Sequence, residues 1–254
     1  MPIDADPSLA PSDAHAHPLH GAAVIVSGAT GAVGKGLLSR LVAIGALPAV
    51  AVRKPWQVET TRALLAGGPG LVAHVGTRDG EAAAGFQKGV TDALGPVRAL
   101  ISTSGRFASA EIGRDPAGED LDLLEANFLT VHNFVRAVAA GMRRRRAGNI
   151  VLCGSASVGH GGSGIALYLA SKAALHEYAR ALAVELAPHG VAVALVTPRT
   201  IDTAAVRQSM PAADRTTWQS VDEVVDRLID AAIARPSTAA DPLLRLPVGP
   251  AERV

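Results

Sequence analysis

A tyrosine and a lysine stand four residues apart in the segment YLASK, residues 168–172. In a helix, Tyr168 and Lys172 would share one face, because residues four apart are neighbours on the helix surface. A free phenol has a pKa of about 10, and a nearby ammonium group lowers that pKa. The pair therefore indicates a phenol that acts as general acid or base, with Lys172 expected to lower the pKa of Tyr168. The alternative is two ordinary side chains on a helix surface.

A serine follows the apolar segment NIVLCG, residues 149–154, which is typical of a buried strand. Ser155 would then lie at the carboxyl edge of a sheet, where open α/β sheets bind their ligands. A hydroxyl at that edge can donate a hydrogen bond to a substrate oxygen and stabilise the charge that develops there. Ser155 is therefore a candidate catalytic residue, with a simple strand cap as the alternative.

A glycine-rich segment, SGATGAVG, occupies residues 27–34. Gly28, Gly31 and Gly34 permit a tight turn, a close approach of the backbone to a ligand, and a helix start whose amide groups face an anion. The segment lies between an expected strand and an expected helix, which is the context that distinguishes a nucleotide site from a structural turn. It predicts a site for the phosphates of a dinucleotide.

The end of the second expected strand, AVAVRKP, indicates which dinucleotide fits. An acidic residue there binds the ribose 2′-hydroxyl, whereas a basic residue pairs with a 2′-phosphate. Arg53 and Lys54 occupy this place, and no acidic residue follows before Glu59. We therefore expect NADP(H) to be preferred over NAD(H). The alternative is that the two cations are only solvated in a loop.

Short apolar segments alternate with helix-length segments from residue 22 onward. The apolar segments are typical of buried strands and span 22–27, 48–52, 71–75, 97–102, 149–154 and 191–196. Helices are expected over 34–45, 80–94, 119–146 and 168–188. This alternation predicts an α/β fold: a Rossmann-type doubly wound parallel sheet of about seven strands with helices on both faces.

The N-terminal segment is rich in proline and histidine and lacks the cationic start and apolar core of a secretory signal. We expect a flexible tail over 1–20 and a single domain over 21–254. His15, His17 and His20 lie in this tail without carboxylate partners, so no metal site is expected there.

The overall composition excludes several classes of protein. A formal net charge of +1 provides no field for nucleic acid or an anionic membrane, and the basic run Arg143–Arg146 fits the last turn of a helix. The single cysteine, Cys153, excludes an intrachain disulfide framework and is expected to be a small buried residue. No apolar stretch has the length of a membrane span. These features indicate a cytoplasmic protein that acts on a small molecule.

Taken together, these motifs resemble those of the short-chain dehydrogenase/reductase family. Tyr168 and Lys172 match its Tyr-x-x-x-Lys, and Ser155, thirteen positions earlier, matches its serine. Asn127 in EANFLTVHNF matches its asparagine, which completes the catalytic tetrad. The resemblance covers nearly all of the chain from residue 22. It implies that Lys172 also holds the cofactor ribose and that Asn127 keeps a water beside this lysine.

The resemblance also assigns residues to cofactor binding. They include the pair already described, Tyr168 and Lys172, and the following: Ser27, Gly28, Thr30, Gly31, Ala32, Val33, Gly34, Arg53, Lys54, Ser104, Gly105, Pro198 and Thr203. Three departures concern the cofactor site. The family's N-N-A-G is STSG here, residues 102–105; Gly76 stands where an aspartate often meets the adenine; and Arg199 replaces the glycine after Pro198.

The implied activity is an NADPH-dependent ketone reductase that also runs as an alcohol dehydrogenase, with Tyr168 as the acid/base. The family commonly assembles through the helices that match 119–146 and 168–188, so a homo-oligomer, a tetramer or a dimer, is expected. A catalytically reduced scaffold that binds NADP(H) as a sensor or partner protein is the alternative. A third reading is an epimerase or dehydratase, which usually carries a larger C-terminal region.

The substrate pocket is expected to have three walls. They are the residues after Ser155 (Val158, Gly159 and His160), the loop after Gly105 (Arg106 and Phe107), and the segment 200–219, which is either a flap or an ordinary loop. Arg106 and Arg199 are weaker candidates for binding an anionic group. His160 is expected to be incidental to the chemistry.

Overall fold

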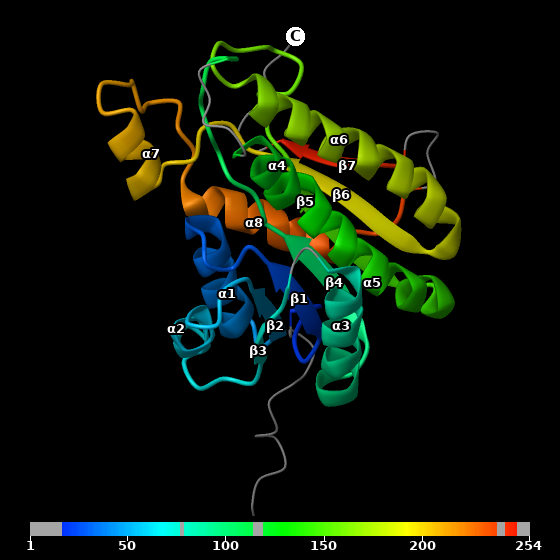
Figure 1. The fold of residues 1–254 in the computed structure, drawn as a ribbon. Helices are drawn as coiled ribbons and strands as arrows, with labels where there is room; N and C mark the ends of the chain where they lie inside the picture. Colours follow the sequence, from blue (N-terminus) through cyan, green and yellow to red (C-terminus); the bar gives the residue numbers. More distant parts are fainter. Residues whose placement is uncertain (1–16, 77–78, 114–118, 238–241, 248–254) are drawn as a thin grey trace, which may run out of the picture.

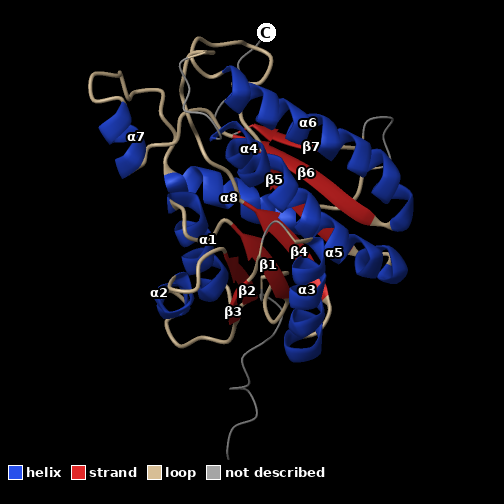
Figure 2. Cartoon of the chain, in the orientation of Figure 1, coloured by secondary structure: helices blue, strands red, loops and turns tan. Residues whose placement is uncertain are grey.

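The computed structural model describes residues 17–76, 79–113, 119–237 and 242–247. Seven strands form one sheet, all pairs are parallel, and the strand order is β3-β2-β1-β4-β5-β6-β7 (Figures 1 and 2). The strands are β1 Ala23–Ser27, β2 Leu47–Val52, β3 Leu71–His74, β4 Val97–Ser102, β5 Gly148–Cys153, β6 Val191–Thr197 and β7 Leu244–Pro247. The expected Rossmann-type sheet is confirmed, and its strand order reverses between β1 and β4.

Small aliphatic side chains fill both faces of the sheet. In β1, Ala23 and Ile25 pack into the core on one face, whereas Val24 and Val26 pack into the core on the other. Successive side chains of a strand point to opposite faces, so a strand that is covered on both sides must be apolar at every position. This explains why the strands read as continuous apolar runs in the sequence.

Helices cover the two faces as separate layers (Figure 1). One layer holds α3 Gly80–Leu94, α5 Thr130–Arg145 and α6 Ala166–Leu186, and the other holds α1 Ala32–Ala43, α2 Gln57–Ala63 and α8 Val221–Ile233. A short helix, α7 Ala204–Ser209, lies inside the segment that was expected to be a flap or loop. Within the described ranges, no helix has the length and apolar character needed to cross a membrane.

The expected helix over 119–146 contains an irregular turn. It consists of α4 Glu119–Leu124, a π-helical turn over Glu125–Leu129, and α5. Asn127 lies in the π-helical turn and is fully buried. Such turns occur mostly as single insertions in α-helices, often at functional sites.

The chain packs against the sheet before residue 21. Residues 1–16 of the expected tail lie outside the described residues, but Leu19 is fully buried in the core beside α1. The Gly21 amide donates to the carbonyl oxygen of Gly45 at 2.8 Å, and a Cβ at Gly45 would meet the ring of His20. The packed chain therefore begins at about residue 17, earlier than the expected domain boundary.

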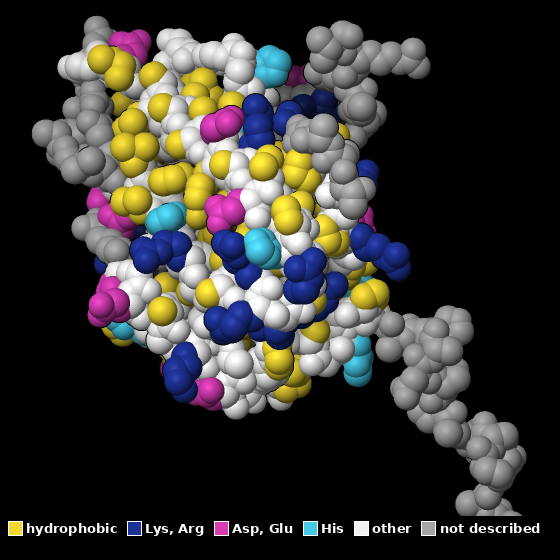
Figure 3. Space-filling model, turned by 90° about the vertical axis from the view of Figure 1, so that its right-hand side faces the viewer, with side chains coloured by type: hydrophobic (Ala, Val, Ile, Leu, Met, Phe, Trp, Pro, Cys, Tyr) yellow, Lys and Arg dark blue, Asp and Glu magenta, His cyan; other side chains and the backbone are white. Residues whose placement is uncertain are grey.

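The basic run lies at the exposed end of α5. Three of its arginines form the last turn of the helix, and Arg146 follows in the left-handed conformation. Arg143 pairs with Glu185 of α6 at 2.9 Å, and Arg145 donates to the carbonyl oxygen of Val97 at 2.8 Å. The side of the molecule on which α5 ends is rich in Lys and Arg side chains (Figure 3). The interpretation of this run as helix-end cations is confirmed.

Candidate active site

Two cavities flank the carboxyl ends of the central strands. The turn cavity, about 250 Å³, is lined by the glycine turn after β1 and by the ends of β2 and β4. The tyrosine cavity, about 300 Å³, is lined by Tyr168, by the end of β5 and by the segment after β6. Thr103, Gly105 and Arg106 line both cavities, so the two lie on either side of one short segment after β4.

The turn after β1 has room only for glycine at its start. Gly28 has φ +82°, and a Cβ there would come within 2.5 Å of the Ser104 amide nitrogen and the Thr103 carbonyl carbon. A Cβ at Gly34 would come within 2.5 Å of Cα of Ala29, so this glycine lets α1 start directly over the turn.

The predicted turn residues fall into two groups. Ser27, Gly28, Thr30 and Gly31 line the turn cavity. Ala32 begins α1, Gly34 packs beneath the turn, and Val33 lines the tyrosine cavity. Gly31 caps α1 without a side-chain hydrogen bond, which leaves the first amide groups of this helix available to an anion.

The two cations after β2 differ in position. Arg53 lines the turn cavity, beside Gln57. Lys54 is not among the lining residues, and its ammonium group lies 5.6 Å from the ring centre of Trp56. Of the pair predicted from the sequence, the structure places Arg53 at the cavity and Lys54 beside it.

Thr130 is a turn-cavity residue that the sequence analysis missed. Its side chain is 3% exposed, and its hydroxyl has no hydrogen-bond partner among the described residues. Buried polar groups in proteins are almost always hydrogen-bonded, so an orphaned hydroxyl on a cavity wall indicates a place for a polar ligand. Together with a turn that excludes any Cβ, this hydroxyl shows that the cavity suits a polar nucleotide.

The STSG segment joins β4 to β1 through hydroxyl groups. Ser27 donates to the Ser102 hydroxyl at 2.8 Å, and the Thr103 hydroxyl donates to the Ser27 carbonyl oxygen at 3.1 Å. Ser104 and Gly105, which are predicted to bind the cofactor, line the turn cavity. These bonds give a physical account of how the strand ends are held without the family's usual asparagine.

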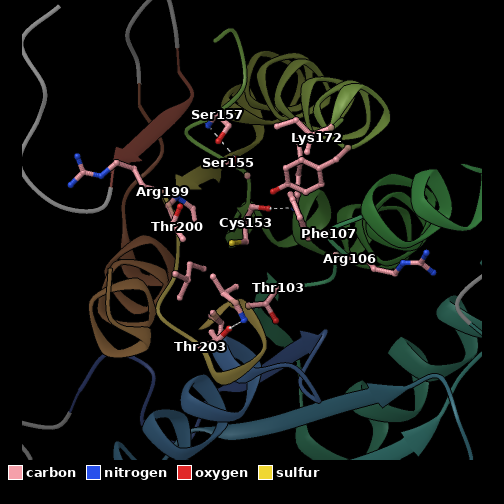
Figure 4. A pocket seen from close by; sticks show the side chains of 18 of the residues that line it. Thr103, Arg106, Phe107, Cys153, Ser155, Ser157, Lys172, Arg199, Thr200 and Thr203 are labelled. Carbon is pink, nitrogen blue, oxygen red and sulfur yellow. Dashed lines mark hydrogen bonds between the residues drawn. The ribbon is translucent and has the colours of Figure 1, made fainter. Parts of the chain in front are cut away.

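Three predicted side chains, Lys172, Ser155 and Tyr168, line one cavity at the end of β5, and Figure 4 labels the first two. Lys172 is buried, and its ammonium group donates to the Cys153 carbonyl oxygen at 3.0 Å. Ser155 is 6% exposed, and its side chain lies close enough to lower the pKa of Tyr168. All three line the tyrosine cavity. The structure therefore places an acid/base candidate, a polar partner and a cation on one wall.

The expected effect of Lys172 on Tyr168 is wrong. Burial raises the pKa of Tyr168, and the hydrogen bond from Ser155 only partly opposes this rise. Burial also lowers the pKa of Lys172 itself. Desolvation disfavours the charged form of either group, and it is the largest cause of both shifts. The phenol is therefore kept protonated at neutral pH.

Asn127 connects the loop after β4 to α6. Its Oδ1 accepts from the Arg106 amide at 2.6 Å, and its Nδ2 donates to the Arg106 carbonyl at 3.1 Å and to the Ser171 hydroxyl at 2.8 Å. A Cβ at Gly105 would lie 3.1 Å from Nζ of Lys172 and 3.2 Å from Oδ1 of Asn127. Asn127 thus sits beside Lys172 and clamps the segment that separates the two cavities. The expected water at this place stays a prediction.

The walls of the tyrosine cavity differ in part from expectation. Phe107 lines it and packs edge-on against Tyr168, with ring centres 5.0 Å apart. After Ser155, however, Ser157 and Ile165 form the wall, and Val158, Gly159 and His160 do not line it. Val158 lies instead on a separate cavity, because the chain turns at 155–160.

The two arginines of the tyrosine cavity direct their charges away from it. In Figure 4 the guanidinium groups of Arg106 and Arg199 extend outward on opposite sides of the cavity. The remaining lining is rich in apolar side chains, among them Ile165, Ile201 and Met210. The arrangement does not favour an anionic group on the substrate.

The segment after β6 forms the last wall and is tied together at its base. Pro198 and Thr203, predicted to bind the cofactor, line this cavity, and the Thr203 hydroxyl caps α7 by accepting from the Val206 amide at 3.2 Å. Gln219, which the sequence analysis missed, is 3% exposed and accepts from the Arg199 amide at 2.7 Å through its side chain. Its backbone bonds to Thr200 and Asp202.

In the described ranges, the potential metal ligands do not form a group large enough to hold a metal ion. No group of three His, Cys, Asp or Glu side chains is placed there to hold an ion, and His15 lies outside those ranges. Burial raises the pKa of the Cys153 thiol, which keeps it protonated on the cavity wall.

Known proteins with similar sequences are dehydrogenases and reductases. The family model for short chain dehydrogenases matches residues 22–214. The 3-oxoacyl-[acyl-carrier-protein] reductase of Vibrio cholerae is 29% identical over 186 residues, which cover 73% of this chain and 75% of that protein. An uncharacterized oxidoreductase of Bacillus subtilis is 28% identical over 172 residues, 68% of each chain.

Solved structures give the same result for the fold. A short chain dehydrogenase/reductase family oxidoreductase from Burkholderia thailandensis is 28% identical, with a TM-score of 0.74 over 89% of this chain and 90% of that one. NAD+-bound xylitol dehydrogenase is 19% identical, with a TM-score of 0.79 over 91% of this chain and 99% of that one.

Proposed function

The chain belongs to the short-chain dehydrogenase family and is an oxidoreductase of that family, and from this premise we propose that it is an NADP(H)-dependent carbonyl reductase. The same enzyme would run as an alcohol dehydrogenase in the reverse direction. One observation carries the proposal: Tyr168, Ser155 and Lys172 share one wall of a cavity that is separated from the glycine turn only by the segment after β4.

The turn cavity is the proposed cofactor site. The backbone of the glycine turn and the start of α1 would hold the phosphates, Arg53 would pair with a ribose 2′-phosphate, and the Thr130 hydroxyl would gain a partner. Lys172 would hold the ribose hydroxyls, and Pro198 and Thr203 would border the nicotinamide. When bound, NADPH supplies the hydride that reduces a carbonyl carbon.

Tyr168 is the proposed proton donor. Its raised pKa keeps the phenol protonated at neutral pH, which is the state required for donating a proton to the carbonyl oxygen as that carbon is reduced. Ser155, which lines the same cavity as the phenol, would donate to the same oxygen and stabilise its developing charge. The oxygen gains one proton and the carbon one hydride, so the product is an alcohol.

The substrate we propose is an uncharged ketone with an apolar body. Phe107, Ile165, Ile201 and Met210 supply apolar surface to a cavity of about 300 Å³, and the two arginines of its lining point outward. Curated relatives named as 3-oxoacyl reductases act on a ketone, which supports this choice of functional group.

Assembly into a homo-oligomer, a dimer or tetramer, remains part of the proposal. Leu129 and Val184 are 48% and 58% exposed on the outer surface of the helical layer that holds α5 and α6. We propose that these two side chains lie in the contact with a second copy.

A spectrophotometric assay tests the function. Purified protein is mixed with NADPH or NADH and a panel of alkyl and aryl ketones, and absorbance of the reduced cofactor is followed. We expect turnover with NADPH, loss of turnover by about 10³-fold or more in Tyr168→Phe, and near-normal turnover in Tyr178→Phe. These are the only two tyrosines of the chain, both lie on α6, and the Tyr178 hydroxyl bonds only to the His132 ring in the described residues.

Two outcomes would contradict the proposal. Turnover retained in Tyr168→Phe would remove the phenol from the chemistry. Tight NADPH binding with no turnover of any ketone or alcohol would favour the alternative, a binding scaffold that has lost activity. That alternative is disfavoured because a scaffold has no need for Tyr168, Lys172 and Ser155 on one cavity wall with Asn127 beside this lysine.

A further inference from the structure

Helix α6 presents more than the tyrosine and the lysine to the end of β5. His176 lies four residues beyond Lys172, so Tyr168, Lys172 and His176 form one stripe on the helix. Lys172 donates to the Cys153 carbonyl oxygen at 3.0 Å, and Nε2 of His176 accepts from the Ser155 amide at 3.1 Å. Two successive turns of α6 thus bind the chain at residues 153 and 155.

The Ser155 amide is unlike its two neighbours. The amides of Gly154 and Ala156 donate to the carbonyl oxygens of Val196 and Pro198, at 2.8 and 2.9 Å, and so continue the pairing of β5 with the chain of β6. The Ser155 amide between them bonds to a side chain, the His176 imidazole, instead. The backbone that carries the Ser155 hydroxyl is therefore held on one side by the sheet and on the other by α6.

The imidazole is neutral and fits closely. Burial and the charges of Lys172, Arg245 and Arg180 lower the pKa of His176 to about 4, so Nε2 keeps its lone pair at physiological pH. A Cβ at Gly154 would meet the His176 ring, so the ring needs a glycine at this position to approach the amide. The absence of a side chain at Gly154 therefore makes room for the His176 ring.

A separate cavity lies behind Ser155, next to the hydrogen bond between its amide and His176. About 220 Å³ of space lies behind Ser155, lined by His176, Ala156 and Val158 together with Arg180 and Arg245. Ser155 lines this cavity and the tyrosine cavity alike, so it belongs to a thin wall between them. Without the imidazole, the Ser155 amide would face this space, and residues 155–156 could shift into it.

We propose that His176 is a positioning residue: by accepting the Ser155 amide hydrogen, it fixes the backbone from which the Ser155 hydroxyl reaches the substrate oxygen and Tyr168. The inference rests on the proposed function, because it assigns Ser155 a role in the reaction. His176 itself touches neither substrate nor cofactor. Its effect is on the rate of the chemical step and not on cofactor binding.

Two substitutions separate the acceptor from the volume of the ring. His176→Leu keeps an apolar side chain of similar size and removes the acceptor, whereas His176→Gln retains an acceptor at a similar reach. We expect kcat to fall about tenfold in His176→Leu, with the NADPH dissociation constant unchanged, and to recover most of that loss in His176→Gln. Tyr178→Phe, two residues along α6, is the control for general loosening of the helix.

A second measurement does not depend on activity. Hydrogen exchange of the Ser155 amide, followed by NMR, should accelerate at least tenfold in His176→Leu and return toward the wild-type rate in His176→Gln. If wild-type protein turns over no carbonyl compound, the proposed function fails, and this exchange rate still tests the contact.

The outcomes are decisive in both directions. Loss of kcat and of amide protection together in His176→Leu, with rescue by glutamine, supports the assignment. The assignment is overturned if the Ser155 amide exchanges equally in all variants. It is also overturned if His176→Leu weakens NADPH binding as much as it lowers kcat, since that would indicate only a structural role for the ring.

Discussion

The turn cavity and the tyrosine cavity lie on either side of the segment after β4, yet backbone shapes the first and side chains shape the second. The turn cavity is shaped mainly by backbone, with a glycine in the left-handed region and amide groups at the start of a helix. The tyrosine cavity is shaped by side chains, several of which come from the segment after β6. At the start of the glycine turn only glycine fits, whereas many apolar residues could form the walls of the tyrosine cavity.

This difference separates the part of the site that would bind any dinucleotide from the part that would select a substrate. A backbone cradle binds phosphates, which any dinucleotide offers, whereas apolar side chains on a loop select one substrate shape. Substitutions should therefore act sharply on the turn cavity and gradually on the tyrosine cavity, apart from its polar wall.

The largest effect should come from Gly28→Ala. The added Cβ would meet the Ser104 amide and the Thr103 carbonyl carbon, and alanine is strained at φ +82°. We expect NADPH affinity to fall by about 100-fold, with a lower melting temperature, because strain of ~1–3 kcal/mol adds to displacement of the cradle. Fluorescence titration and thermal unfolding measure the two effects.

Gly85→Ala is the matched control for this substitution. Gly85 lies in α3, and a Cβ there has nothing within 4 Å. This variant should bind NADPH normally and gain ~0.5–1 kcal/mol of stability, since alanine suits a helix better than glycine. Equal behaviour of the two variants would show that the turn is not sterically limited.

The next effect concerns the side chain that we assign to the 2′-phosphate. Arg53→Ala should weaken NADPH binding by about 10-fold to 100-fold and leave NADH binding unchanged, because a charge-assisted hydrogen bond is worth ~1.5–3 kcal/mol. Lys54→Ala is the control, as Lys54 lies over Trp56 and does not line the cavity. If both substitutions weaken NADPH binding equally, the cations act only through their general field.

A smaller effect is expected on the substrate side. Phe107→Ala removes the ring that packs on Tyr168, so KM for aryl ketones should rise about threefold to tenfold while NADPH binding is unchanged. Ile112→Ala, in the same loop but 80% exposed and outside the cavity lining, should have no effect. A loss of kcat above 100-fold in Phe107→Ala would show that the tyrosine cavity is as sensitive to substitution as the glycine turn.

The smallest effect is a dependence of stability on pH that comes from His176. Its folded pKa is lowered to about 4, so between its ordinary pKa of 6.5 and about 4 the unfolded chain binds a proton that the folded chain does not. Stability should therefore fall as pH decreases through this window, by about 1–2 kcal/mol after solvent screening. Urea unfolding at several pH values should show a shallower dependence in His176→Gln, and equal slopes would contradict the lowered pKa.

Sequence patterns were sufficient where one local signal decides the structure. The alternation of apolar runs and helical segments predicted the sheet, because a strand covered on both faces must be apolar throughout. The spacing of Tyr168 and Lys172 placed both on one face of α6, and the position of Ser155 after an apolar run placed it at the sheet edge. These inferences need only the periods of helix and strand.

The missed features depend on packing between distant segments. The π-helical turn at Asn127 differs from an α-helical turn by one residue, which apolar periodicity does not resolve. The raised pKa of Tyr168 follows from burial, which spacing does not report. Thr130 reaches the turn cavity, and His176 and Gln219 reach their hydrogen-bond partners, only once helix and sheet, or two ends of a loop, have come together.

Gln219 makes the segment after β6, which forms one wall of the tyrosine cavity, a loop with fixed ends. Its hydrogen bonds to the chain at 199, 200 and 202 close the base of the intervening segment, so the length of that segment is independent of the sheet below. Doubling the length of a loop with fixed ends costs only about 0.6 kcal/mol in closure entropy. A longer or shorter insert could therefore be grafted between residues 203 and 218 to change which ketones enter, while the proton-donating wall keeps its place.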